Sequence, residues 1–145
     1  MLWTPEKQYR EEPFDVDVES DLEDAILQSA SSLFGDSRLY LDAKRLIGAR
    51  GRTRNIPDGY LLDLSSTRDP KLFVVENELA KHEPLRHVAV QILEFSLSFE
   101  ASPHLVKSIV REALGLKTEF LSRCQNYALK NGFENVDYLL ERMIC

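Results

Sequence analysis

The chain has 145 residues, 43% hydrophobic and 29% charged, with a net charge of -6; this composition excludes a disordered chain and favours one soluble domain with its own core. No apolar run approaches the roughly 20 residues of a membrane span, and the N-terminal residues lack the apolar stretch of a secretory signal. Cys124 and Cys145 form no CxxC pair, which favours free thiols in a reducing cytoplasm.

The charge is distributed unevenly along the chain. Residues 1–24 contain nine acids and two bases, whereas residues 38–54, the basic segment, contain six bases and one acid. A basic stripe in an acidic protein can guide a polyanion to one place on the surface. Arg50, Arg52 and Arg54 are therefore candidates for contact with nucleic-acid phosphates. The alternative is that these arginines only keep a hairpin solvated.

Residues 1–19 form an acidic lead-in without clean periodicity, and the first helix signal follows it. Ser20 and Glu23 fit a capping box, in which Ser20 is the N-cap and Glu23 reaches back to it. Apolar residues then recur at helical spacing until Gly35 interrupts the pattern. This pattern predicts one amphipathic helix.

Three short apolar segments joined by polar turns come next. They are residues 38–49, 56–64 and 71–79. Their short connections predict an antiparallel meander of three strands. The residues expected to be buried in the third strand are Leu72, Phe73, Val74 and Val75.

The apolar period changes to that of helices in the second half of the chain. One stripe at helical spacing predicts a helix that packs back on the sheet; it consists of Leu85, Val88, Ala89, Ile92, Ser96 and Phe99. Start signals predict three further helices, at Ser102-Pro103, at Thr118 and at Asn135. No segment after residue 100 has the pattern of a strand, and His104 is expected to face solvent.

Carboxylates gather at the predicted strand ends. Glu76 and Glu78 share one face of the third strand because strand side chains alternate, and antiparallel pairing would place Asp58 beside them. Like charges at that range are costly unless a cation neutralises them, and Mg²⁺ is commonly held by one or two carboxylates. The alternatives are a Pro-Asp-Gly turn at Asp58 and a solvated strand end at Glu76 and Glu78.

The order of these residues carries a family resemblance. Pro57-Asp58, an apolar strand ending in Glu76-Asn77-Glu78, and a helix with Gln91 resemble the PD-(D/E)xK nuclease superfamily, also called restriction-endonuclease-like. The resemblance implies an α+β fold with a restriction-endonuclease-like α/β core: a helix, a three-strand antiparallel meander and a packed helix.

The resemblance also divides the chain into parts. Residues 1–19 are the acidic lead-in, residues 20–100 the nuclease-like core, and residues 101–145 a helical segment. The final core strand of the superfamily is missing. In this respect the chain is similar to bacterial restriction-like proteins with a helical insertion before the last strand, so we expect a fragment or a minimal form.

The resemblance implies roles for individual residues. In the superfamily, the residues matching Asp58 and Glu76 bind Mg²⁺ (or Mn²⁺), and the backbone carbonyl of Asn77 is the expected third ligand. Gln91 looks like the glutamine of a Gln-x-x-x-aromatic motif found in some branches, since Phe95 follows it by four residues; the alternative is a polar residue at the border of the apolar stripe.

Four other residues complete the expected site. Glu23 lies where many members place an extra acid, with the capping box as the alternative. Glu78 stands where the superfamily usually has lysine, so the tasks of orienting the attacking water and balancing charge would pass to Lys81, or to a second metal held partly by Glu78. His87 is a further candidate for phosphate contact.

The implied function is Mg²⁺-dependent endonuclease activity, the hydrolysis of phosphodiester bonds in DNA by a cytoplasmic protein without a membrane partner. The alternative is a catalytically inactive nuclease-like fold that serves as a nucleic-acid-binding or protein-interaction module.

Overall fold

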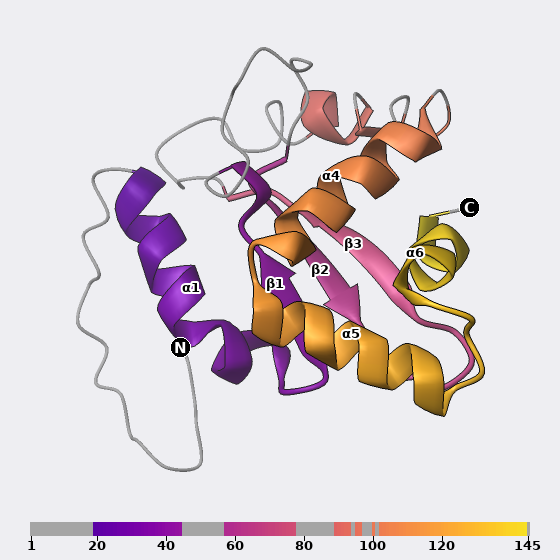
Figure 1. Ribbon diagram of the computed structural model, residues 1–145. Helices are drawn as coiled ribbons and strands as arrows, with labels where there is room; N and C mark the ends of the chain where they lie inside the picture. Colours follow the sequence, from indigo (N-terminus) through magenta and orange to yellow (C-terminus); the bar gives the residue numbers. More distant parts are fainter. Residues whose placement is uncertain are drawn as a thin grey trace.

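The computed structural model describes residues 19–44, 57–77, 89–93, 95–96, 100 and 102–144. The elements in chain order are helix α1 (Glu19–Phe34), strands β1 (Arg38–Leu41), β2 (Gly59–Asp63) and β3 (Lys71–Val75), and helices α4 (Pro103–Gly115), α5 (Thr118–Lys130) and α6 (Val136–Ile144). A helix, an antiparallel sheet and C-terminal helices confirm the predicted α+β class (Figure 1). No helix in the described part of the chain is long and apolar enough to cross a bilayer.

The sheet is the predicted meander, with strand order β1-β2-β3 and antiparallel pairing throughout. Leu62 of the central strand pairs with Leu39 on one side and with Leu72 on the other. The strands are shorter than predicted. β1 ends at Leu41, and Lys44 already has helical backbone conformation, so the predicted strand over residues 38–49 is wrong at residues 42–44, and residues 45–49 lie outside the described residues.

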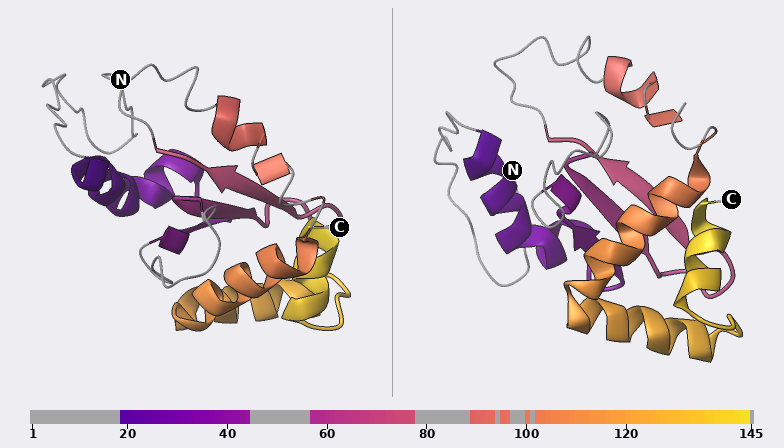
Figure 2. Two further views of the ribbon diagram at one scale, coloured as in Figure 1. Left: turned by 90° about the horizontal axis from the view of Figure 1, so that it is seen from above. Right: turned by 45° about the horizontal axis from the view of Figure 1, so that its top comes forward.

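The hydrophobic core lies between one face of the sheet and the C-terminal helices. In the left view of Figure 2, α4, α5 and α6 lie together on one side of the sheet. Alternating strand residues supply the sheet side of this core, because side chains of one parity share a face. The largest contributors are Leu39, Leu41, Tyr60, Leu62, Val110, Leu114, Leu139 and Leu140.

The opposite face of the sheet is only partly covered. Tyr40, Leu61 and Phe73 lie side by side across the three strands, and their exposed fractions are 5%, 8% and 45%. α1 contacts β1, and the Phe34 ring stacks on the Tyr40 ring with centroids 5.6 Å apart. The prediction that Phe73 is buried is therefore wrong, because α1 covers the β1 side of this face and Phe73 lies on the far strand.

The ends of α1 show which local signals acted as predicted. Gly35 follows the helix with φ of +83°, a left-handed conformation that glycine adopts without strain, and its N–H donates to the Ser31 carbonyl. The predicted capping box is wrong, since α1 begins at Glu19 and Ser20 is a helical residue. Glu23 therefore does not act as the capping residue of α1.

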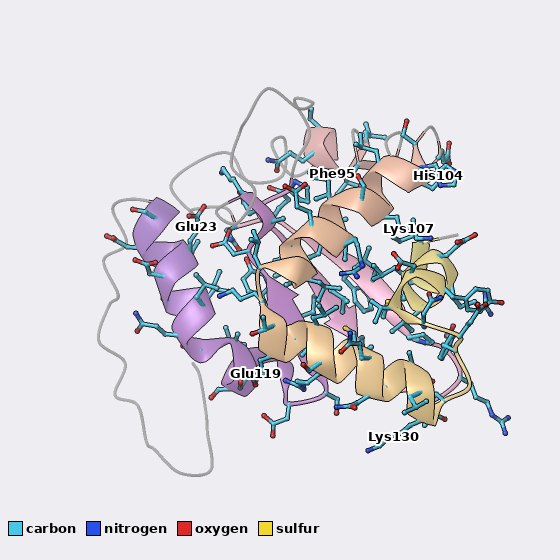
Figure 3. The ribbon with its side chains drawn as sticks, viewed as in Figure 1. Glu23, Phe95, His104, Lys107, Glu119 and Lys130 are labelled. Carbon is cyan, nitrogen blue, oxygen red and sulfur yellow. The ribbon has the colours of Figure 1, made fainter. Side chains whose placement is uncertain are left out.

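The C-terminal helices follow the predicted pattern with one exception. Ser102 is the N-cap of α4 and Pro103 occupies its first turn, as expected. Thr118 was predicted to cap α5, but Lys117 holds that position and Thr118 is already helical. Only helices follow the sheet among residues 102–144, and His104 is exposed near the start of α4 (Figure 3).

Gly59 is a position where the fold requires the absence of a side chain. A methyl group there would lie 2.5 Å from Cε2 of Tyr40, whose ring is held by Phe34. We expect Gly59→Ala to lower the free energy of unfolding by about 1–3 kcal/mol, because the added atom overpacks a buried contact. Urea denaturation followed by circular dichroism would measure the change.

Gly115→Ala is the matched control, because an added methyl group at Gly115 meets no atom within 4 Å. Its stability should equal that of the wild type or exceed it by up to about 1 kcal/mol, since alanine favours the helix. Equal stability of Gly59→Ala and wild type would contradict the close packing of Tyr40 on Gly59.

Candidate functional site

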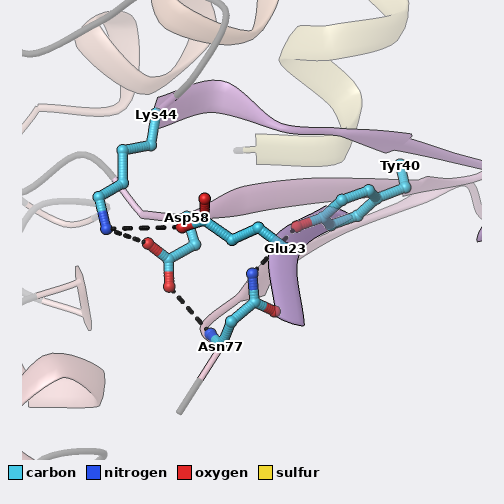
Figure 4. Close-up of polar contacts among 5 residues, drawn as sticks. All are labelled: Glu23, Tyr40, Lys44, Asp58 and Asn77. Carbon is cyan, nitrogen blue, oxygen red and sulfur yellow. Dashed lines mark hydrogen bonds and ion pairs between the residues drawn. The ribbon is translucent and has the colours of Figure 1, made fainter. Parts of the chain in front are cut away.

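Asp58 is a buried carboxylate at the mouth of the sheet, where β2 begins. Its residue is 8% exposed, and the adjacent Pro57 is fully buried. Asp58 Oδ1 accepts a hydrogen bond from Lys44 Nζ at 2.7 Å, and Oδ2 accepts one from the backbone N–H of Asn77 at 2.9 Å (Figure 4). One carboxylate thus connects the segments that follow β1 and β3 to the start of β2, so it is more than a solvated turn residue.

Lys44 is the cation that meets this carboxylate. Its backbone N–H also donates to the Asp58 carbonyl at 3.4 Å, which continues the contact between the first two strands beyond their ladder. The Lys44 side chain is 52% exposed, whereas that of Asp58 is 10% exposed. The ammonium group therefore sits at the boundary between solvent and the buried acid.

Glu23 reaches the same place from α1. Its Oε1 lies 3.9 Å from Lys44 Nζ, and its side chain is 17% exposed. Glu23 lies on the side of α1 that faces the sheet (Figure 3). The structure therefore brings Glu23 to the expected site, although its contact there is with a lysine, and its role as a metal ligand stays a prediction.

Asn77 supports the Asp58 carboxylate from the other side, and Tyr40 in turn contacts the Asn77 side chain. Asn77 is 8% exposed, and its Nδ2 donates to the Tyr40 hydroxyl at 3.4 Å. Burial raises the pKa of Tyr40, the hydrogen bond from Asn77 partly offsets this, and the charges of Asp42 and Asp58 raise the pKa further. Tyr40 therefore stays protonated, and Asn77 is held by both its side chain and its backbone.

Glu76 follows β3 and lies close to Asp58. Burial, the negative charge of Asp58 and a hydrogen bond with the Asp58 side chain together raise the pKa of Glu76 to about 8, although a hydrogen bond with the Asp58 backbone and the charge of Lys44 partly offset them. Its Oε1 atom is buried and has no hydrogen-bond partner among the described residues. The two carboxyl groups are thus near enough to interact, and one carries an unsatisfied oxygen.

Gln91 lies on a helical stretch, residues 89–93, and its Oε1 atom is likewise buried without a partner in the described part of the chain. Gln91 and Phe95 are half-buried and share a helix face, because they are four residues apart. Ala89 and Ile92 of the predicted apolar stripe are exposed, Ile92 to 57%. The predicted stripe is wrong at these residues, since the inward face is the one with Gln91.

Several predicted site residues lie outside the described residues: Arg50, Arg52, Arg54, Glu78, Lys81 and His87. Within the described ranges, no group of three or more His, Cys, Asp or Glu side chains could hold a metal ion. Among the described residues, the predicted Mg²⁺ ligands are the carboxyl groups of Asp58 and Glu76 and the backbone carbonyl of Asn77. Metal binding by these three groups stays a prediction.

Sequence reasoning missed two residues of this site. Lys44 was counted only within the basic segment, because residues 38–49 were expected to be a regular strand. Asp42, which directly follows β1, is 5% exposed, and its charge acts on Tyr40. Two charged residues in the Asp-Ala-Lys sequence at the end of the apolar run were the available signal that the strand ends early.

Comparisons of this chain with protein-family models, with curated proteins and with solved structures find no match.

The raised pKa of Glu76 predicts how stability depends on pH without metal. Below about pH 4.5 the carboxyl group is protonated in both states, and between there and pH 8 only the folded state keeps the proton. Stability should therefore fall as pH rises through this window. We expect Glu76→Gln to melt at a higher temperature than wild type at about pH 8 and to differ little at about pH 5, in buffers with EDTA.

Glu134→Gln is the control, because Glu134 is an exposed loop residue. It should follow the wild-type melting curve at every pH. A melting temperature of Glu76→Gln that keeps a constant offset from wild type across the window would contradict the proposed burial and charge of Glu76.

Proposed function

We propose that this protein is a Mg²⁺- or Mn²⁺-dependent hydrolase of phosphodiester bonds in DNA. It would act at the end of the sheet where β2 begins and β3 ends, beside Asp58 and Glu76. The observation that carries the proposal is the buried Glu76 Oε1, which has no partner among the described residues and lies in a carboxyl group beside the buried Asp58 carboxylate. A cytoplasmic location belongs to the same proposal.

The donor set fits a hard divalent cation. Such ions prefer carboxylate and carbonyl oxygens at about 2.1 Å and complete their shell with water and substrate phosphate oxygens. A buried acceptor without a partner costs free energy, which a cation bound at Glu76 Oε1 would recover. Asp58 Oδ1 already faces a cation, the Lys44 ammonium, so this position has the electrostatic character that a metal needs.

The residues around the acids have separate tasks in this proposal. The backbone N–H of Asn77 holds Asp58 Oδ2 in place, so Oδ1 keeps its direction. Glu78 and Lys81 place and activate the attacking water, as the resemblance to PD-(D/E)xK nucleases implies, and Gln91 steadies the site. A bound metal would polarise the phosphate and lower the pKa of its bound water.

DNA is the proposed substrate because of the basic segment, residues 38–54, in an otherwise acidic chain. Lys44, a member of that segment, lies at the mouth of the site. Arg50, Arg52 and Arg54 are the proposed phosphate contacts of the flanking backbone, together with His87.

Two observations favour the second candidate, a nuclease-like module that binds nucleic acid or protein without cleaving. Lys44 already neutralises one oxygen of Asp58, and Glu78 replaces the lysine usual in the superfamily. Wild-type protein that binds DNA and cleaves neither DNA nor RNA in Mg²⁺ or Mn²⁺ would favour this candidate.

Glu76→Ala should reduce Mg²⁺-dependent cleavage of plasmid DNA to the level seen in EDTA, because it removes a proposed ligand. The fold should persist, since Glu76 lies beyond the end of β3 and outside the hydrophobic core. Agarose-gel cleavage assays and circular dichroism would measure both effects.

Glu134→Gln serves as the control with full activity. Glu78→Lys, which introduces the lysine usual in the superfamily, should retain or increase the wild-type rate. Unchanged cleavage by folded Glu76→Ala would exclude the site as the source of the activity.

Arg50, Arg52 and Arg54 allow a separate test of DNA binding. Replacing all three with alanine should weaken binding to duplexes of any sequence and lower the slope of log affinity against log salt by about two to three units, because each phosphate contact contributes about 0.9. Fluorescence anisotropy over a salt series would measure this slope.

The matched control replaces three exposed bases elsewhere: Arg68, Lys130 and Arg142. It changes the net charge equally, so it should leave the slope near that of the wild type. Equal slopes for the two triple variants would show that net charge, and not a local contact, determines DNA binding.

A further inference from the structure

We propose that Lys44 is an internal counter-ion of the site, which the divalent cation must displace from Asp58 and which then contacts the substrate phosphate. This inference rests on the proposed function. It assigns two roles to Lys44: competition with the metal ion for Asp58, and contact with the substrate phosphate. Lys44 would thereby supply a positive charge that the chain lacks at Glu78.

The first step concerns the position of the ammonium group. Lys44 Nζ lies 2.7 Å from Asp58 Oδ1, while the other oxygen of the same carboxylate is bound to the Asn77 N–H. A metal ion that takes Asp58 as a ligand without disturbing Asn77 must therefore use Oδ1. Lys44 and the metal compete for one oxygen atom.

The second step concerns the solvent exposure of the Lys44 side chain. Its side chain is 52% exposed, so the ammonium can move into solvent without being buried elsewhere. Asp58 keeps its orientation during this exchange, because its Oδ2 bond to a backbone N–H does not depend on the lysine. The exchange replaces one cation with another at a carboxylate that stays fixed.

The third step concerns where the displaced ammonium goes. Glu23 Oε1 lies 3.9 Å from Nζ, beyond hydrogen-bond distance but close enough to attract it. The Glu23 carboxylate keeps the lysine at the mouth of the site after the metal binds. A phosphate that approaches the metal there meets an exposed ammonium, and an ammonium is a compact charge suited to phosphate oxygens.

The test measures Mn²⁺ alone, without DNA, by electron paramagnetic resonance of the free ion. Lys44→Met should bind Mn²⁺ about tenfold more tightly than the wild type, because the competing charge is gone. Lys44→Arg keeps the charge and should bind Mn²⁺ like the wild type. Lys71→Met is the matched control: Lys71 pairs with Asp69 at 3.4 Å, but both side chains are exposed.

Binding of a short DNA duplex in Ca²⁺ provides the second readout. Lys44→Met should bind the duplex several-fold more weakly than wild type despite its tighter metal binding, whereas Lys71→Met should not differ. A lysine with only a structural role would not move the two affinities in opposite directions. If Lys44→Met unfolds, Lys44→Gln replaces it, since glutamine can still donate to Asp58 Oδ1 without a charge.

Each outcome decides the inference separately from the proposed function. Unchanged or weaker Mn²⁺ affinity in a folded Lys44→Met or Lys44→Gln variant overturns the inference, even if the wild type cleaves DNA. Tighter Mn²⁺ binding with weaker duplex binding supports it, even if the wild type cleaves nothing, in which case only the hydrolytic function fails. Absence of Mn²⁺ binding in wild type and variants overturns both.

Discussion

The buried Asp58 carboxylate is the constraint on which the end of the sheet depends. A charge removed from water must be paired and hydrogen-bonded, and Asp58 meets this need with one ammonium and one backbone N–H. These two partners belong to segments that follow β1 and β3. The carboxylate therefore fixes how the outer strands leave the sheet on either side of β2, which no apolar contact at this edge could do with the same directionality.

The other unusual contacts at this edge follow from that constraint. Asn77 is held beside Asp58 by its backbone, which presents its side-chain amide to the Tyr40 hydroxyl. Tyr40 then lies flat over Gly59, where only a glycine leaves room for the ring. Glu76, one residue before Asn77, is left near an existing negative charge in a partly buried place, and this is why its pKa is raised. One buried acid thus determines the surroundings of four neighbours.

Much of the fold could be predicted from the sequence because its signals are local. The Gly35 stop, the Ser102-Pro103 start and the alternation of three strands act through the backbone of a few adjacent residues. The position of Asp58 beside Glu76 was predictable as well, since antiparallel pairing brings those strand ends together. The position of the Lys44 side chain was not predictable, because its direction depends on the helical backbone after Leu41 and on a carboxylate 14 residues away. The inward face of the Gln91 helix was missed for a similar reason: burial of an amide oxygen depends on tertiary contacts.

The neutralising groups at this end of the sheet explain how three acids, Glu23, Asp58 and Glu76, can lie close together in a folded protein. Asp58 and Glu23 share the Lys44 ammonium, at 2.7 Å and 3.9 Å, and Glu76 retains a proton because its pKa is raised to about 8. Under the proposed function, both the exposed lysine and the proton would give way to a bound cation while the sheet stays folded. The burial of Asp58 and of the Glu76 Oε1 atom is what distinguishes this end of the sheet from a solvated strand end.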